Sequence, residues 1–455
     1  MERKVNIIGA GLAGCECAYI LAKNGIKVRL YEMKPNFKSE AHKSDEFAEL
    51  VCSNSLKSEL ITNACGLLKK EMEMLGSLFI EAAYNAKVPA GQALAVNRDI
   101  FSKYITKKIK ENENIEVVYE KVKSLNDIDG IKVIATGPLT DSVLMNSLKD
   151  KIGQEDLYFY DAAAPIISSD SIDMNIAYWG DRYEQERKRN ESIDEWKERI
   201  SKISKSDYLN LPMNKEEYER FCNELVNAEV VTLHDFEKKD IFEGCMPIEV
   251  MAKRGIDTLR FGPLKPVGFT DLRTGSRPYA NVQLRMENVE GKSFNIVGFQ
   301  TNLKFGEQKR VFSLIPGLKN AIFERYGVMH KNTYINGGKL LDNNFCLKKD
   351  NNIYFAGQIS GVEGYVESAA SGMMVAYSII ERFNGSELVF PEDTMLGSLA
   401  KYVSTENVNY QPMNANFGII KPLDIKIKDK KQKYTAIANI SLDSIERFKN
   451  SKSWR

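Results

Sequence analysis

The chain begins with a glycine-rich turn between a short apolar strand and a helix, and this arrangement constrains the fold more than any other feature. The pattern predicts a buried strand over 5–8, a turn over 9–14, and a helix that runs to about Lys23. A second strand follows over 27–31, and Glu32 closes it. Together these segments make one βαβ unit of about thirty residues. The sequence therefore predicts an α/β fold built on a Rossmann-type parallel sheet.

Each glycine of this turn has a separate task in a nucleotide-binding unit. Gly9 permits the tight turn, Gly11 lets the backbone approach a pyrophosphate, and Gly14 lets the helix pack closely on the sheet. Glu32 is placed to bind ribose hydroxyls, which disfavours a 2′-phosphate there. We therefore expect a dinucleotide cofactor. In this unit its expected contacts are Gly9, Ala10, Gly11, Leu12, Ala13, Gly14 and Glu32.

A second strand–glycine–helix unit appears more than three hundred residues later. A buried strand is expected over 352–356, and a helix rich in small residues is expected from about Glu367 to Phe383. Such a late unit suits a flavoprotein, in which this helix N-terminus faces the isoalloxazine ring, so FAD is the expected cofactor. The contacts expected from this unit are Gly357, Gln358, Gly361, Val362 and Gly364.

The middle of the chain differs from both ends in composition and pattern, with aromatic runs, prolines and strand-like segments such as 280–284. We interpret it as an α+β domain inserted into the FAD-binding domain. The expected division is 1–154 for the first part of the FAD-binding domain, 155–320 for an inserted substrate or RNA domain, 321–440 for the second part, and 441–455 for a C-terminal tail. Residues 184–206 are almost wholly polar and are expected to form an exposed helix or a mobile loop.

Two of the seven cysteines have unusual neighbours. Cys245 precedes Pro247, a residue that favours the first position of a helix, so its thiol should lie near a helix N-terminus that lowers its pKa. Cys52 is followed by Ser53, Asn54 and Ser55, a polar setting that is unusual for a core cysteine. Both are candidates for covalent catalysis. Cys15, Cys17 and Cys65 have apolar neighbours in helical segments and are expected to serve packing.

Composition limits the other possibilities. The 63 basic and 62 acidic residues leave a net charge of +1, so an RNA contact requires a local patch, such as the lysine-rich segment 421–433. The cysteines lack Cys-x-x-Cys pairs, and none of the three histidines has metal-ligand spacing, so no metal site is expected. No signal peptide or apolar membrane span is evident, which favours a cytoplasmic protein without a membrane partner.

Seven further segments have the length and composition of family motifs. They are 45–56, 158–165, 242–247, 261–268, 298–301, 361–368 and 411–418. Together with the first glycine turn, these segments resemble the folate- and FAD-dependent tRNA uracil-5-methyltransferase family known as TrmFO, and the resemblance covers nearly the whole chain.

The resemblance implies an enzyme that takes a methylene group from 5,10-methylenetetrahydrofolate, reduces it with electrons from NAD(P)H through FAD, and methylates the T-loop uridine (position 54) of tRNA. Cys245 matches the family cysteine that adds to uracil C6, which turns C5 into a nucleophile. Cys52 matches the cysteine near the flavin, where it can hold or shield the methylene carried on flavin N5. His330 matches a residue that stacks on the folate pterin.

Three residues depart from the family pattern. Lys43 replaces a histidine, Asn97 stands where an aspartate is common, and Gln92 replaces a glycine. Lys43 and the long segment 184–206 could alter contacts with folate or RNA.

A paralog that methylates a 23S ribosomal RNA uridine by the same chemistry is the main alternative. The larger FAD enzymes that modify the wobble uridine, and a flavin-binding protein without methyl transfer, are the others.

Overall fold

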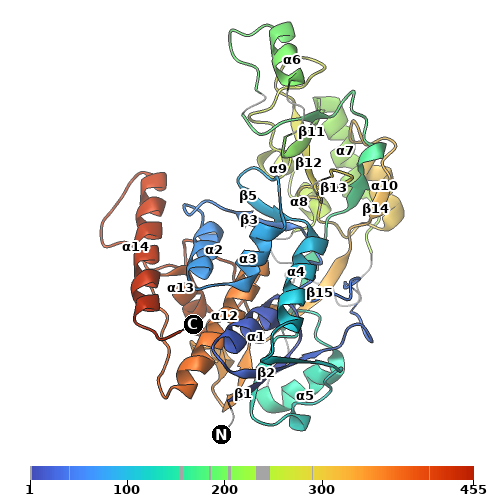
Figure 1. Cartoon of the computed structure of the whole chain (residues 1–455). Helices are drawn as coiled ribbons and strands as arrows, with labels where there is room; N and C mark the ends of the chain where they lie inside the picture. The colour runs from blue at the N-terminus through green and yellow to red at the C-terminus, as the bar shows by residue number, and fades with distance from the viewer. Residues whose placement is uncertain are drawn as a thin grey trace.

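The structure is a computed structural model that describes residues 3–39, 41–153, 157–183, 186–202, 206–231, 246–288, 290–408 and 410–454. For residues 150, 157–161, 330 and 331 it describes the backbone. The fold has two regions. The larger region contains both chain ends, and the smaller region projects from it (Figure 1).

A six-stranded sheet forms the centre of the larger region. Its neighbours pair in parallel except for the edge pair β16 and β17. Strand β1 lies between β2 and β7, so the winding of the chain reverses at β1, and ligands of such sheets bind outside the carboxyl ends of the strands at this point. In spatial order the strands are β16 (Cys346–Leu347), β17 (Asp350–Phe355), β7 (Ile131–Ile134), β1 (Lys4–Ile8), β2 (Lys27–Glu32) and β6 (Ile115–Tyr119).

The helices that follow β1 and β17 pack against each other beside this sheet (Figure 1). They are α1 (Leu12–Lys23) and α12 (Tyr365–Phe383). Small residues allow the close approach, because a Cβ atom at Gly372 would lie 2.2 Å from the carbonyl oxygen of Ala13. The two predicted strand–glycine–helix units therefore stand side by side, and the prediction of an α/β fold with a Rossmann-type sheet is confirmed.

Further helices and a three-stranded sheet surround this core. None of the described helices combines a membrane-spanning length with a sufficiently apolar composition. The elements are β3 (Ser55–Ser58), α2 (Ala64–Met74), α3 (Leu78–Asn85), β4 (Lys87–Val88), β5 (Ala93–Val96), α4 (Arg98–Lys110), α5 (Ser142–Ile152), α11 (Gly337–Leu340), α13 (Met395–Ser404) and α14 (Lys430–Asn450).

The smaller region has its own six-stranded sheet and its own hydrophobic core, in which Phe299 and Phe312 are fully buried. The chain enters it through β8 (Leu157–Ala162) and leaves it through β15 (Met329–Tyr334), which pair with each other. Its strands, in spatial order, are β10 (Tyr178–Trp179), β11 (Tyr208–Met213), β12 (Ala280–Met286), β13 (Ser293–Ile296), β9 (Ile166–Ser168) and β14 (Phe323–Arg325). Its helices are α6 (Ile193–Ser201), α7 (Lys215–Asn227), α8 (Ile248–Lys253), α9 (Thr258–Phe261) and α10 (Phe305–Phe312).

The polar segment 184–206 contains α6, which begins with a capping box between Ser192 and Glu195. Its side chains are mostly exposed, but Trp196 is fully buried. Trp196 and the buried Ile200 fix the helix on the smaller region, and burying the indole removes the larger apolar area from water.

The chain end is part of the packed structure. Helix α14 crosses the boundary expected at residue 441, and the Trp454 indole stacks on the Tyr377 ring at 3.9 Å between centroids. Ile445 is fully buried. Residues 441–454 therefore continue the larger region instead of forming a separate tail.

Candidate functional site

The glycine turn after β1 is tight for the chain itself at two positions and open at a third. A Cβ atom at Gly9 would lie 2.6 Å from the Ala135 carbonyl oxygen, and one at Gly14 would lie 1.9 Å from the Gly9 carbonyl oxygen. At Gly11 the nearest atom would be 4.0 Å away. Packing therefore requires Gly9 and Gly14, whereas Gly11 leaves room that a ligand can use.

A cleft opens at the carboxyl ends of the parallel strands, between the two glycine units. It has about 1180 Å³ of empty volume, part of it open to solvent. Eight of the residues expected to contact the cofactor line it, namely Gly9, Ala10, Gly11, Leu12, Ala13, Glu32, Gly357 and Gln358. The structure thus brings together groups that lie more than three hundred residues apart in the sequence.

The other four expected cofactor contacts shape the turns behind the cleft and are not part of its lining. Gly14 serves the helix packing described above. A Cβ atom at Gly361 would lie 2.2 Å from the Tyr410 hydroxyl oxygen, and Val362 is fully buried beside Met413. Gly364 is the N-cap residue of α12.

Glu32 is buried at the end of β2, where its carboxylate is fixed by two backbone groups. Its Oε2 accepts a hydrogen bond from the Ala10 N–H at 2.9 Å, and its Oε1 accepts one from the Lys34 N–H at 2.8 Å. Each carboxylate oxygen has a further lone pair, so both remain able to accept ribose hydroxyls.

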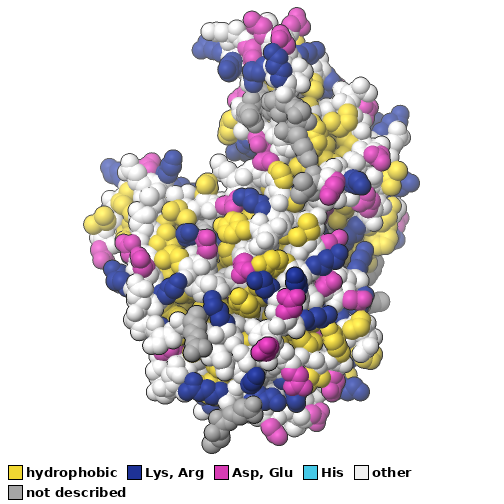
Figure 2. All heavy atoms as spheres, viewed as in Figure 1, with side chains coloured by type: hydrophobic (Ala, Val, Ile, Leu, Met, Phe, Trp, Pro, Cys, Tyr) yellow, Lys and Arg dark blue, Asp and Glu magenta, His cyan; other side chains and the backbone are white. Residues whose placement is uncertain are grey.

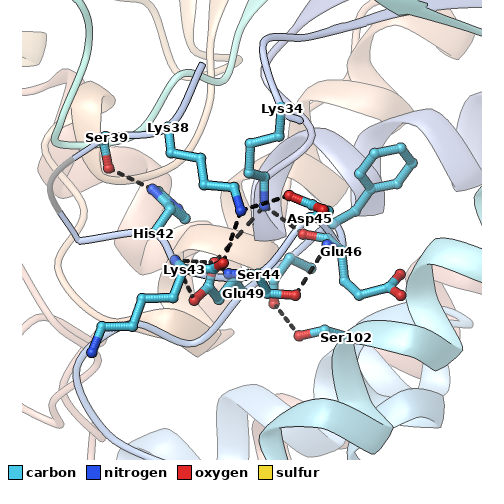
Figure 3. A network of polar contacts seen from close by, with 12 residues as sticks. Lys34, Lys38, Ser39, His42, Lys43, Ser44, Asp45, Glu46, Glu49 and Ser102 are labelled. Carbon is cyan, nitrogen blue, oxygen red and sulfur yellow. Dashed lines mark hydrogen bonds and ion pairs between the residues drawn. The ribbon is translucent and has the colours of Figure 1, made fainter. Parts of the chain in front are cut away.

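The segment after β2 folds back on itself beside the cleft through a network of polar contacts (Figure 3). His42, which lines the cleft, shares a 2.6 Å hydrogen bond between its Nδ1 and the Ser39 hydroxyl. The Glu49 carboxylate accepts hydrogen bonds from the N–H groups of Lys43 and Ser44. The Lys43 side chain is exposed and points away from this network, so the departure at this position leaves the network unchanged (Figure 3).

Cys52 is half-buried next to the first turn of α12. Its N–H donates to the Tyr365 hydroxyl at 2.6 Å, and the Ser53 N–H donates to the same oxygen at 3.1 Å. Tyr365 and Val51 both line the cleft, so Cys52 lies at its edge. Burial, together with the neighbouring Cys52, raises the pKa of Tyr365, which keeps the phenol protonated.

Three arginines hold the chain on both sides of Cys52, namely Arg98, Arg285 and Arg325. Their acceptors are the carbonyl oxygens of Leu50 (3.1 Å) and Val51 (2.6 Å) and the side-chain oxygens of Ser53 (3.1 Å) and Asn54 (3.0 Å). Arg285 and Arg325 belong to β12 and β14 of the smaller region, and burial lowers the pKa of both. The position of the Cys52 backbone therefore depends on how the two regions dock.

Sequence reasoning did not identify these arginines or Tyr365 as partners of Cys52. Tyr365 lies inside a segment that was recognised as a motif, but no local pattern assigns it a contact. Arg285 is separated from Asn54 by 231 positions, and such a contact has no signature in a single sequence.

Cys245 and His234 lie outside the described residues, so their predicted places are not tested. The predicted helix after Cys245 is present as α8, with Pro247 as its N-cap residue and Ile248 as its first residue. The helix therefore begins one residue later than a proline at the first helical position implies. His330 is on β15, where its backbone pairs with that of Asp161.

The remaining described cysteines are buried in the hydrophobic cores, as predicted for Cys15, Cys17 and Cys65. Burial raises the pKa of each thiol, for Cys65 and Cys346 to about 11. Such thiols are neutral at physiological pH and are poor nucleophiles. Among the described cysteines, Cys52 alone is half-buried beside the cleft.

The lysine-rich segment 421–433 is exposed and includes the first turn of α14. Lys430 and Lys431 lie at the N-terminal end of this helix, where the helix dipole disfavours positive charge. Elsewhere on the face shown in Figure 2, basic and acidic side chains alternate without a large field of one sign. The Nζ atom of Lys430 lies 5.6 Å from the centroid of the Tyr434 ring, a cation–π contact, and the other lysines of the segment are exposed to solvent.

Comparison with known proteins gives one family model and several close relatives for this chain. A family model described as Glucose inhibited division protein A matches residues 4–387. The methylenetetrahydrofolate–tRNA-(uracil-5-)-methyltransferase TrmFO of Acetivibrio thermocellus is 54% identical over 446 residues, which are 98% of both chains. The protein of the same name from Staphylococcus aureus (strain Newman) is 51% identical over 454 residues, 99% of this chain and 100% of that one.

A solved structure shares the fold. The crystal structure of Aquifex aeolicus GidA (form I) superposes with a TM-score of 0.66 at 14% identity, and the match covers 99% of this chain and 79% of that one. Both TrmFO relatives align with this chain over nearly their whole length, and more than half of the aligned residues are identical. This similarity establishes the family. The chain belongs to the TrmFO family of enzymes.

Proposed function

We propose that this protein methylates C5 of the T-loop uridine (position 54) of tRNA, with 5,10-methylenetetrahydrofolate as carbon donor and FAD reduced by NAD(P)H. The observation that carries the proposal is the half-buried Cys52 at the edge of a dinucleotide-sized cleft, in a chain 54% identical to a protein named for this reaction. In this assignment the larger region holds the cofactor and the smaller region faces the RNA. The smaller region extends past the expected boundary at residue 320, since β14 belongs to its sheet and the chain leaves it through β15.

The cleft suits FAD in its shape and in its polar groups. Gly11 leaves space beside the backbone at the N-terminus of α1, where a pyrophosphate is favoured by free N–H groups and by the helix dipole. Glu32 presents its carboxylate to ribose hydroxyls, and Gln358 lines the cleft from the second unit. When bound and reduced, FAD supplies the two electrons that convert a methylene into a methyl group.

The chain's own residues supply the remaining chemistry. In this proposal the Cys245 thiolate adds to uracil C6, and the resulting enolate attacks the methylene carbon through C5. Loss of the C5 proton expels the one-carbon carrier and leaves an exocyclic methylene on C5. Reduction of that methylene by two electrons and a proton, together with departure of the thiolate from C6, then gives the 5-methyl base. Cys52, fixed through Tyr365 and the arginines, shields the methylene at the cleft edge, and His330 stacks on the pterin.

The proposal is tested with the purified protein and separate unmodified tRNA and 23S ribosomal RNA transcripts. The protein should be yellow and should release FAD on denaturation. It should transfer one carbon from labelled methylenetetrahydrofolate to tRNA only when NAD(P)H is present, and the 5-methyluridine should map to the T-loop. Transfer to ribosomal RNA alone would replace the proposed substrate, and a colourless protein that takes up no FAD would overturn the cofactor.

Binding of tRNA should depend on the lysine-rich segment 421–433. Replacing Lys428, Lys430 and Lys431 together with alanine should weaken tRNA binding and lower the slope of log affinity against log salt by about 2 to 3, because each phosphate contact contributes about 0.7 to 0.9. Filter binding across a salt series measures both quantities. FAD content and NAD(P)H oxidation should stay unchanged.

Three exposed lysines of the larger region serve as the matched control, namely Lys103, Lys107 and Lys123. Their joint replacement by alanine removes the same charge and should leave the salt slope near the wild-type value. Equal losses in both triple variants would mean that the effect is one of overall charge, and the segment would have no special part in binding.

A further inference from the structure

Helix α10 and strand β14 lie next to each other at the edge of the smaller region (Figure 1). Three aromatic rings from this part of the chain form a stacked row. The rings of Phe323 and Tyr326 are 5.1 Å apart between centroids with an interplanar angle of 8°. The rings of Tyr326 and Phe305 are 4.9 Å apart with an angle of 14°. We call Phe323, Tyr326 and Phe305 the aromatic row.

The aromatic row is closed at one end and open at the other. The Phe323 ring contacts Phe312, which is fully buried in the core of the smaller region. Phe305, the first residue of α10, is 53% exposed although Tyr326 covers one face of its ring. The exposure therefore comes from the opposite face and the ring edge. An open aromatic face that continues a rigid stack has the form of the platforms on which unpaired nucleobases stack.

The row is connected to the Cys52 site through neighbouring backbone. Arg325, between two members of the row in the sequence, donates to the carbonyl oxygen of Val51, the residue before Cys52. Gly327, the next residue after the row, exchanges two 2.8 Å hydrogen bonds with the Gln308 side chain on α10. The Gln308 side chain thereby ties α10, and with it Phe305, to the strand that holds the Cys52 loop.

The row also lies near both described flanks of the segment that contains Cys245. The Val231 N–H donates to the Asn302 carbonyl oxygen at 2.9 Å, and the Ile248 N–H donates to the Gln300 carbonyl oxygen at 2.7 Å. Phe305 follows three residues after Asn302. A base that stacks on Phe305 would therefore lie near the described ends of the segment that carries Cys245.

The charges around Phe305 fit a neutral planar group. Lys304 pairs with Glu229 at 2.6 Å, and Arg310 pairs with Glu307 at 2.8 Å, so opposite charges compensate each other next to the ring. We propose that Phe305 stacks an unpaired nucleobase of the RNA substrate, next to the uridine that is turned out of its loop for methylation. The inference rests on the proposed function, since it takes RNA as the substrate.

The first test compares steady-state kinetics of Phe305→Ala with the wild type on unmodified tRNA. Loss of a stacked base should raise KM for tRNA about 5- to 150-fold and leave KM for methylenetetrahydrofolate unchanged. Phe305→Trp keeps an aromatic face and should restore the wild-type KM. Tyr84→Ala is the matched control, since Tyr84 is a 46% exposed aromatic residue of α3 in the larger region and does not line the cleft, and it should leave KM unchanged.

A second test does not need turnover. Saturating tRNA should quench the added tryptophan emission of Phe305→Trp, measured against the wild type, which has the three native tryptophans. Filter binding should show the loss of affinity in Phe305→Ala at wild-type FAD content and melting temperature. These binding results stand even if the wild type methylates no tRNA, so a failure of the proposed function is distinguished from a failure of this inference.

Three results would overturn the inference. One is an unchanged tRNA affinity in Phe305→Ala, and another is an equal loss in Tyr84→Ala. The third is a raised KM for methylenetetrahydrofolate with normal RNA affinity, which would assign the open ring face to the pterin.

Discussion

Replacement of Cys52 by alanine should leave the protein yellow and able to bind tRNA but should abolish methyl transfer. The Cys52 side chain lies at the edge of the cleft, while its backbone is held by Tyr365 and the arginines, so removal of the sulfur leaves the loop in place. Loss of a residue that acts covalently or shields a reactive carbon typically lowers turnover by several orders of magnitude. Single-turnover transfer of labelled carbon to tRNA measures the loss, and the flavin absorption spectrum should change because the proposed place of the Cys52 sulfur is beside the bound flavin.

Two further variants make this result specific. Cys245→Ala should also retain FAD and lose transfer, and it alone should lose the covalent complex with RNA that contains 5-fluorouracil, because that complex needs the thiolate at C6. Cys346→Ala is the control, since burial raises the pKa of that thiol to about 11 and it lies away from the cleft. Normal transfer by Cys52→Ala would leave Cys52 with a structural role.

The Gly11→Ala variant should fold like the wild type but should purify without FAD. The nearest protein atom to a Cβ at this position is 4.0 Å away, and the Gly11 φ of −76° is open to alanine, so the protein itself tolerates the methyl group. A pyrophosphate bound against this backbone would clash with the methyl group, because a glycine at this position permits the close approach of the phosphates. Flavin absorbance after purification, reconstitution with added FAD and the melting temperature of the apoprotein measure the effect.

Gly14→Ala is the contrasting variant in the same turn. Its Cβ atom would lie 1.9 Å from the Gly9 carbonyl oxygen, so helix α1 must move and the variant should be strongly destabilised or insoluble. Comparison of Gly11→Ala with Gly14→Ala therefore distinguishes a glycine that is needed for the ligand from one that is needed for packing. Retention of full FAD content by Gly11→Ala would show that the cofactor does not approach the backbone at this turn.

The parts of the fold that depend on local patterns could be predicted from the sequence. Strand β1, helix α1 and strand β2 end within a residue or two of the expected positions, because apolar runs and glycine turns mark them directly. The position of Glu32 at the end of β2 follows from the same spacing. The second unit was predicted for the same reason, with helix α12 beginning two residues before the expected Glu367.

The parts that depend on distant contacts could not be predicted. Nothing near Arg285 or Arg325 in the sequence indicates that their side chains reach the Cys52 loop, since these contacts join residues more than two hundred positions apart. The burial of Trp196 in the polar segment 184–206 could not be predicted, because one tryptophan among many charged residues leaves the average composition polar. The end of the chain appeared to be a tail because Ile445 and Trp454 find their partners in distant parts of the fold.

The arginine contacts around Cys52 have a consequence for how the protein is made. During synthesis the chain emerges from its N-terminus, so the loop that bears Cys52 exists long before Arg285 and Arg325 are available to hold it. The sheet is incomplete as well until β17 has been translated and pairs with β7. A nascent chain of the first 154 residues therefore has the thiol and Arg98, but it lacks Tyr365, the two arginines of the smaller region and the far side of the cleft. The contacts that hold the Cys52 backbone and the second wall of the cleft are therefore completed only when nearly the whole chain is present.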